Sequence, residues 1–105
     1  MSQFIIITTT SDAVDVLARI ADRLVAEQLA ACCQVSQPIK SVYRWDGKVE
    51  SSSEVELKIK TAAAKFEEVS TVIKSLHNYD VPQIVAVDVT YVDDGYGEWL
   101  GESLS

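Results

Sequence analysis

Residues 41–61 read SVYRWDGKVESSSEVELKIKT and contain the feature that decides the fold. Asp46-Gly47 is typical of a two-residue hairpin turn, in which both positions take a positive φ. From position 54 onward charged and apolar residues alternate, which is the period of a strand with one buried face. The apolar face has Val55, Leu57 and Ile59, and the charged face has Glu54, Glu56, Lys58 and Lys60. This stretch predicts a β-hairpin whose second strand runs over 48–61.

The flanking segments add further strands and helices. Residues 3–10 are mostly β-branched and predict a buried strand, and residues 31–45 predict another, broken by Pro38 at an edge or a bulge. Apolar residues at helical spacing predict two helices, and Ser11-Asp12 supplies an N-cap for the first. The helices are expected over 12–30 and 62–77, a last strand over 83–91, and a short helix in the tail from Asp93. The order β-α-β-β-α-β predicts an α+β, ferredoxin-like fold with an antiparallel sheet, in one domain over 1–105.

The lengths of these elements predict an oligomer. A helix of 16 residues spans about 24 Å, whereas a strand over 48–61 spans roughly 45 Å. The helices therefore leave the hairpin projecting beyond the sheet, with Tyr43 and Trp45 near its tip. Exposed apolar surface and unpaired strand edges favour pairing with neighbouring subunits.

Composition excludes several classes of partner. The 105 residues carry 16 acidic and nine basic side chains, for a net charge of −7, which disfavours nucleic acid. The longest apolar run, Phe4–Ile7, is far short of the roughly 20 residues that cross a bilayer. No signal sequence is predicted, because no basic region is followed by an apolar stretch and a cleavage site. No disulfide framework is predicted, because Cys32 and Cys33 are adjacent. We therefore expect a cytoplasmic protein with no membrane partner.

The cysteines and the single histidine are the candidate metal ligands. Adjacent residues of a strand point to opposite faces, so Cys32 and Cys33 cannot both bind one ion, and packing is the favoured role for each. His77 lies at the expected end of the second helix, where a cationic imidazole suits the helix dipole. Its alternative role is to bind copper or another borderline ion together with other donors.

A second candidate site uses charged and aromatic residues. Glu54 and Lys60 are expected on a solvated strand face, which in an oligomer could line a cleft that binds an anion. Trp45 and Tyr79 could stack on a ligand there, although a subunit interface is the favoured role for Trp45. The sequence contains no phosphate-binding loop and no nucleophile with a matching base, so we expect no enzymatic activity.

Several segments together resemble the CutA divalent-cation tolerance family. They are Leu29–Cys32, Ser41–Val49, Glu54–Thr61, His77–Pro82, and Tyr96 with Trp99. The resemblance covers nearly the whole chain and implies a ferredoxin-like homotrimer, in the cytoplasm for bacterial members, linked to copper and other divalent metals.

The resemblance carries over only part of a metal site. His77 matches a family copper ligand, and Cys32 matches a second family cysteine that we keep as a possible soft donor. Thr8 and Leu76 occupy the positions where the best-known bacterial pattern has a cysteine and a first histidine. The leading hypothesis is a homotrimer that binds Cu(II) or a similar divalent cation.

Two other functions stay open. The first is a signalling trimer of the PII type, similar in architecture alone, that binds an anionic metabolite between subunits. Lys60, Glu54, Trp45 and Tyr79 would then hold the metabolite. The second is a structural scaffold whose product is the trimer itself.

Overall fold

The computed structural model describes residues 3–105. The elements are, in order, β1 (Phe4–Ser11), α1 (Val14–Ala26), β2 (Cys32–Val35), β3 (Ile39–Trp45), β4 (Lys48–Ala62), the 3₁₀ turn η1 (Ala63–Lys65), α2 (Phe66–Leu76), β5 (Val85–Asp88) and α3 (Asp94–Ser103). The predicted α+β, ferredoxin-like fold is confirmed.

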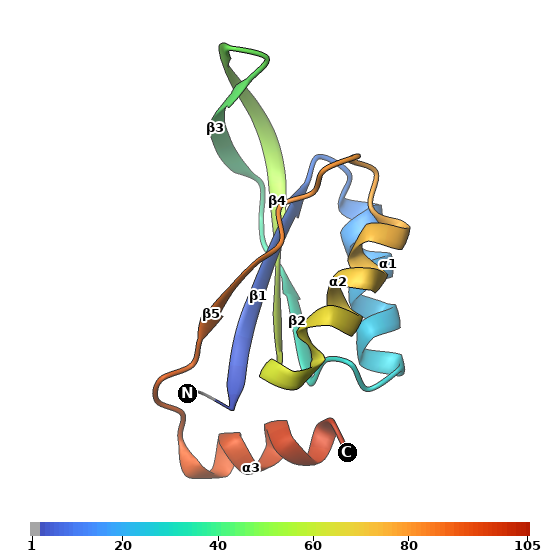
Figure 1. The fold of residues 1–105 in the computed structure, drawn as a ribbon, viewed down its shortest axis with the longest axis vertical. Helices are drawn as coiled ribbons and strands as arrows, with labels where there is room; N and C mark the ends of the chain where they lie inside the picture. The colour runs from blue at the N-terminus through green and yellow to red at the C-terminus, as the bar shows by residue number, and fades with distance from the viewer. Residues whose placement is uncertain (1–2) are drawn as a thin grey trace.

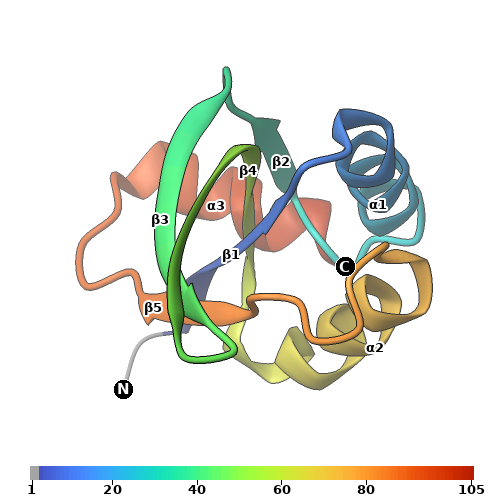
Figure 2. The same ribbon diagram turned by 90° about the horizontal axis from the view of Figure 1, so that it is seen from above.

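The sheet has the strand order β2-β4-β1-β5, and β3 pairs with the outer half of β4. All the pairings are antiparallel. Helices α1 and α2 lie together on one face of the sheet (Figure 2). Ile7 and Ile59 are cross-strand partners on that face, and Leu17 and Ile73 bring the two helices against them in the buried core. In β4 this packing follows the alternation, because only the side with Val55, Leu57 and Ile59 is apolar enough to be buried, whereas β1 begins with a continuous apolar run, Phe4–Ile7.

The hairpin turn at Asp46-Gly47 forms as predicted, with φ of 51° and 73° at the two positions. Strand β4 has 15 residues, and the molecule measures 44 × 25 × 24 Å. The β3–β4 hairpin projects beyond both helices, at the top of Figure 1. It exposes 63% of Val42, 61% of Trp45 and 67% of Val49. The projection expected from the element lengths is therefore present.

Some predicted boundaries were wrong by several residues. Helix α1 ends at Ala26 instead of residue 30, because Gln28 takes a φ of 58° and the Leu29 and Ala30 N–H groups bond back to the Leu24 carbonyl. The second helix begins at Phe66, after η1, and the last strand covers only Val85–Asp88. The break at Pro38 and the tail helix were predicted correctly, and the Asp93 side chain caps the tail helix.

None of the helices in the part of the chain that the structure describes is both long and apolar enough to cross a bilayer.

Candidate functional site

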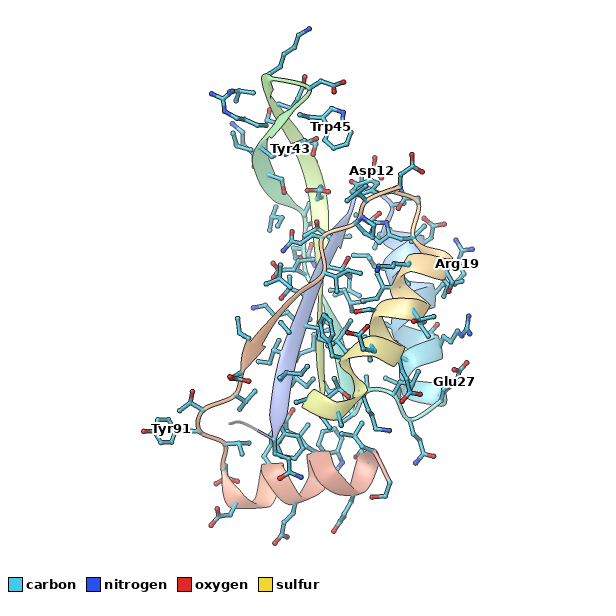
Figure 3. All side chains as sticks on the ribbon, in the orientation of Figure 1. Asp12, Arg19, Glu27, Tyr43, Trp45 and Tyr91 are labelled. Atoms are coloured by element: carbon cyan, nitrogen blue, oxygen red, sulfur yellow. The ribbon has the colours of Figure 1, made fainter. Side chains whose placement is uncertain are left out.

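A pocket of about 560 Å³ lies along the projecting hairpin, from Glu54 at its base to Trp45 near its tip. Its walls come from three segments: the end of β1, the β3–β4 hairpin and the loop after α2. The lining residues are Thr10, Ser41, Val42, Tyr43, Trp45, Glu54, Tyr79, Asp80, Val81 and Gln83. Figure 3 shows Tyr43 and Trp45 on the hairpin, above the end of β1 where Asp12 lies. Three of the four predicted cleft residues thus line one pocket: Tyr79 contacts Glu54, whereas Trp45 lies further along the hairpin, where it pairs with Lys48.

Tyr79 joins the loop after α2 to the hairpin base. Its hydroxyl donates a 2.6 Å hydrogen bond to Glu54 Oε2 and accepts a 2.9 Å bond from the Asp12 backbone N–H. Burial, followed by the hydrogen bond to Glu54, raises the pKa of Tyr79 above its ordinary value. The phenol therefore stays protonated and remains the donor to the carboxylate.

His77 has both ring nitrogens engaged within the chain. Nδ1 accepts a 3.0 Å hydrogen bond from the Tyr79 backbone N–H, and Nε2 lies 2.8 Å from the Thr10 carbonyl oxygen. A nitrogen that accepts carries no proton, so these partners assign the neutral tautomer with the proton on Nε2, which donates to Thr10. A metal ion at His77 would have to displace one of these two bonds.

A second group of hydrogen bonds holds the same loop against the start of α1. Ser11 Oγ donates to Asn78 Oδ1 at 2.6 Å, and Asn78 Nδ2 donates to Asp12 Oδ1 at 2.8 Å. Ser11 Oγ also accepts from the Ala13 N–H at 3.0 Å. The N-cap of α1 is Ala13, and no side chain caps this helix, so the predicted N-cap at Ser11-Asp12 was wrong.

Lys60 lies away from the pocket. Its Nζ donates to the Tyr96 hydroxyl at 3.3 Å and sits 5.3 Å from the centre of the Tyr96 ring. Lys60 and Glu54 share a face of β4, but six residues of strand separate them by roughly 20 Å. Within one chain the structure does not bring Lys60 to the other three cleft residues.

The two cysteines point to opposite faces, as expected from their adjacency. Cys33 pairs with Ile59 and packs against the core, whereas Cys32 pairs with Lys60 on the face away from the helices. Burial, followed by the neighbouring charges of Cys32 and Asp22, raises the pKa of Cys33 from 9.0 to about 12.

Cys32 and His77 do not converge within one chain. His77 contacts Thr10, which pairs with Glu56, and Cys32 pairs with Lys60 four residues further along β4. That separation is about 13 Å along the strand. Among residues 3–105 no group of three or more His, Cys, Asp or Glu side chains is placed to hold a metal ion.

Sequence reasoning missed four polar pocket residues, which are Thr10, Ser41, Asp80 and Gln83. Asp80 and Gln83 lie in or beside His77–Pro82, which the resemblance included without giving either residue a role. Thr10 ends a predicted strand and carried no separate signal. The Thr10 hydroxyl donates to Gln83 Oε1 at 3.4 Å, and the two residues are 73 positions apart in the sequence. They come together only because the loop after α2 packs against the end of β1.

Comparisons with known proteins agree with this architecture. The family model described as CutA1 divalent ion tolerance protein matches residues 4–103. A CutA protein of Arabidopsis thaliana, named as chloroplastic, is 42% identical over 85 residues; the match spans 81% of this chain but only 47% of that protein.

A Thermus thermophilus protein, named as divalent-cation tolerance protein CutA, is 37% identical over 103 residues and 98% of each chain. The crystal structure of CutA from Xylella fastidiosa superimposes with a TM-score of 0.94 at 33% identity, over 99% of this chain and 100% of that one. The chain belongs to the CutA1 divalent ion tolerance family.

Proposed function

We propose that this chain acts in divalent-cation tolerance as a homotrimer that binds the cation and catalyses no reaction. The observation that carries the proposal is the projecting hairpin with exposed Val42, Trp45 and Val49. Apolar side chains gathered at the end of a hairpin are typical of a surface that another subunit covers.

The sheet face opposite the helices supports the same assembly. Ile6 pairs with Val87 and Thr8 with Val85, and the register places these residues away from the core residues Ile5 and Ile7. Val85 and Val87 are exposed in the single chain. Because both helices cover one face of the sheet, its other face is available to the sheets of partner subunits. The exposed valines of this face add to the apolar surface of the hairpin.

We propose Cu(II) as the cation, because it has the highest affinity of the divalent first-row series for nitrogen and oxygen donors. His77 is the proposed imidazole ligand and Cys32 the proposed soft donor, with the remaining donors supplied by other subunits. Binding at His77 displaces the Tyr79 N–H from Nδ1 or the Thr10 carbonyl from Nε2, so the expected affinity is lower than that of a preformed site.

Light scattering combined with a metal titration tests the proposal. We expect a mass of about three times the 11.5 kDa of the chain. Competition with a chromophoric copper chelator should show binding that His77→Ala weakens strongly and that Cys32→Ser weakens less. A monomer would overturn the assembly, and equal copper affinity in wild type and His77→Ala would overturn the ligand assignment.

We also propose a cytoplasmic location, because both cysteines are free and thiols persist in a reducing compartment. The Arabidopsis relative is named as chloroplastic, so relatives of this chain differ in compartment. Fractionation of the native host, followed by detection of the chain with an antibody, tests this location.

A further inference from the structure

We propose that Lys60 of a neighbouring subunit binds Glu54 and closes the pocket along the hairpin. The proposal rests on the homotrimer proposed above and adds to it the ion pair that joins each subunit to the next. The single chain has the carboxylate and the ammonium group at two distant points of one sheet face, so only a second copy of the chain brings them together.

Glu54 is a buried carboxylate that lacks a cation within its own chain. Only 8% of the residue is exposed, and its one side-chain partner among the described residues is the Tyr79 hydroxyl. Asp80 lines the same pocket, and no lysine, arginine or histidine of the described chain lines it. Because desolvation of an unpaired charge is costly, a carboxylate buried to this extent is expected to have a cationic partner.

Four charged side chains alternate along the face of β4 opposite the helices. They are Glu54, Glu56, Lys58 and Lys60. The middle two pair with each other, with 3.8 Å between Lys58 Nζ and Glu56 Oε1. Lys60 has no ion pair among the described residues, and its Nζ donates to the neutral Tyr96 hydroxyl at 3.3 Å. This face therefore keeps one unpaired carboxylate and one unpaired ammonium group.

The length of β4 prevents these two charges from pairing within one chain, because six residues of strand separate them by roughly 20 Å. In a ring of identical subunits each interface joins two different patches, one from each neighbour. An interface that joins Glu54 of one subunit to Lys60 of the next therefore pairs every such carboxylate and ammonium group in the ring. Val85 and Val87 lie exposed on the same sheet face, so covering this face also removes apolar surface from water.

The other basic residues without an ion pair in the described chain are less suited to Glu54. They are Lys40, Arg44, Lys48, Lys65 and Lys74. Lys40 and Arg44 alternate with Ile39, the cross-strand partner of Glu54, so they lie on the other face of the hairpin. Lys48 is exposed beside the hairpin turn, and the last two residues belong to η1 and α2 in the helical layer. Lys60 is the one that lies on the sheet face that the trimer buries.

A double-mutant cycle on the dissociation of the trimer tests the ion pair. Glu54→Gln removes the charge and keeps an acceptor for the Tyr79 hydroxyl, and Lys60→Gln removes the ammonium group. We expect each variant to raise the protein concentration at which light scattering shows dissociation by about tenfold or more. The double variant should dissociate at nearly the same concentration as either single one, because the second change removes a charge that has already lost its partner.

Lys58→Gln is the matched control, because Lys58 lies on the same face of β4 but pairs with Glu56 in its own chain. Its effect should add to that of Glu54→Gln without coupling. Charge reversal is a second, independent measurement. Glu54→Lys and Lys60→Glu should each abolish the trimer, and the two changes in one chain should restore it, because the pair forms again with its signs exchanged. Far-UV circular dichroism checks that each variant is folded.

Three results would overturn the ion pair in a protein whose wild type is a trimer. The first is additive effects of Glu54→Gln and Lys60→Gln. The second is a charge-reversed double variant that is folded but dissociated. The third is coupling of Glu54→Gln to Arg44→Gln instead, which would place the neighbouring hairpin in the pocket. A monomeric wild type would overturn the homotrimer itself, so the two proposals fail on different observations.

Discussion

The Tyr79 hydroxyl and the Glu54 carboxylate are 2.6 Å apart and lie 25 residues apart in the sequence. This bond fastens the loop after α2 to the strand that continues into the projecting hairpin. The Asp12 N–H bonds to the same hydroxyl, so three segments meet at one oxygen atom.

Replacing Tyr79 with Phe should destabilise the fold by about 1–3 kcal/mol. The change leaves the buried Glu54 carboxylate without its partner, and an unmatched buried polar group costs roughly this much, whereas the exposed Asp12 N–H can bond to water instead. Denaturant unfolding at pH 7 measures the loss. Tyr91→Phe is the control, because Tyr91 is 91% exposed, and its unfolding midpoint should stay at the wild-type value. Equal midpoints for the two variants would show that the bond contributes nothing.

Trp45→Ala should weaken the proposed trimer by about 2–4 kcal/mol, as expected for a large apolar anchor at an interface hot spot. Dilution series followed by light scattering measure the effect, with dissociation appearing at higher protein concentration than in wild type. Arg19→Ala is the control, since Arg19 lies on the outer side of α1, away from the hairpin (Figure 3). Identical dissociation curves for Trp45→Ala and wild type would remove Trp45 from the interface.

The glycine of the hairpin turn should respond to alanine in the opposite sense to a helical glycine. Gly47 has a φ of 73° and nothing near its missing Cβ, so Gly47→Ala adds only backbone strain, about 1 kcal/mol of destabilisation. Gly101 lies inside α3, where a Cβ would meet the Phe4 ring at an ordinary 4.0 Å. Gly101→Ala should stabilise the chain by about 0.5–1 kcal/mol. Thermal unfolding compares the two, and a loss of stability in both would contradict the conformational argument.

Cys32 should react with a thiol reagent much faster than Cys33 in the native protein at pH 8. The thiolate is the reactive form, and burial raises the pKa of Cys33 to about 12, so very little of it is ionised. Labelling of Cys32→Ser and Cys33→Ser separates the two rates. Fast labelling of Cys33 in the Cys32→Ser protein would show that the thiol is not sequestered.

The raised pKa of Cys33 also makes the free energy of unfolding depend on pH in the alkaline range. The pKa of Cys33 is higher in the folded chain than its ordinary value of 9.0, so the folded state favours the protonated thiol. Its contribution is fully present below pH 9 and is lost as the pH rises from 9 to about 12.

The stability difference between wild type and Cys33→Ala should therefore shrink over this pH range, and Cys32→Ala is measured beside it for comparison. Urea unfolding at pH 8, 10 and 11 measures both. A constant difference for Cys33→Ala would contradict the burial of the thiol. Tyr79 adds a loss of its own at high pH, because its pKa is also raised, but this loss is common to all three proteins.

Much of the fold could be predicted from local sequence, because local spacing reports which face of an element is buried. The alternation of Val55, Leu57 and Ile59 predicts the buried face of β4, and Asp46-Gly47 predicts the turn. The end of α1 could not be read in this way. Leu29 continues the apolar spacing of the helix, yet the chain turns at Gln28, because Leu29 and Ala30 form a capping turn on Leu24.

The sequence by itself determined the order of elements, the projecting hairpin, the opposite faces of Cys32 and Cys33 and the resemblance to the family, because these depend on neighbouring residues. Only the tertiary structure decided which side chains meet. Loop closure brought Tyr79 and Asp80 to Glu54, and it engaged both nitrogens of His77 with backbone groups. Lys60 shares a strand face with Glu54, but the length of an extended strand keeps it out of the pocket. The alternation of side chains along a strand determines which face each residue lies on. It carries no information on which end of that face a loop distant in the sequence will cover.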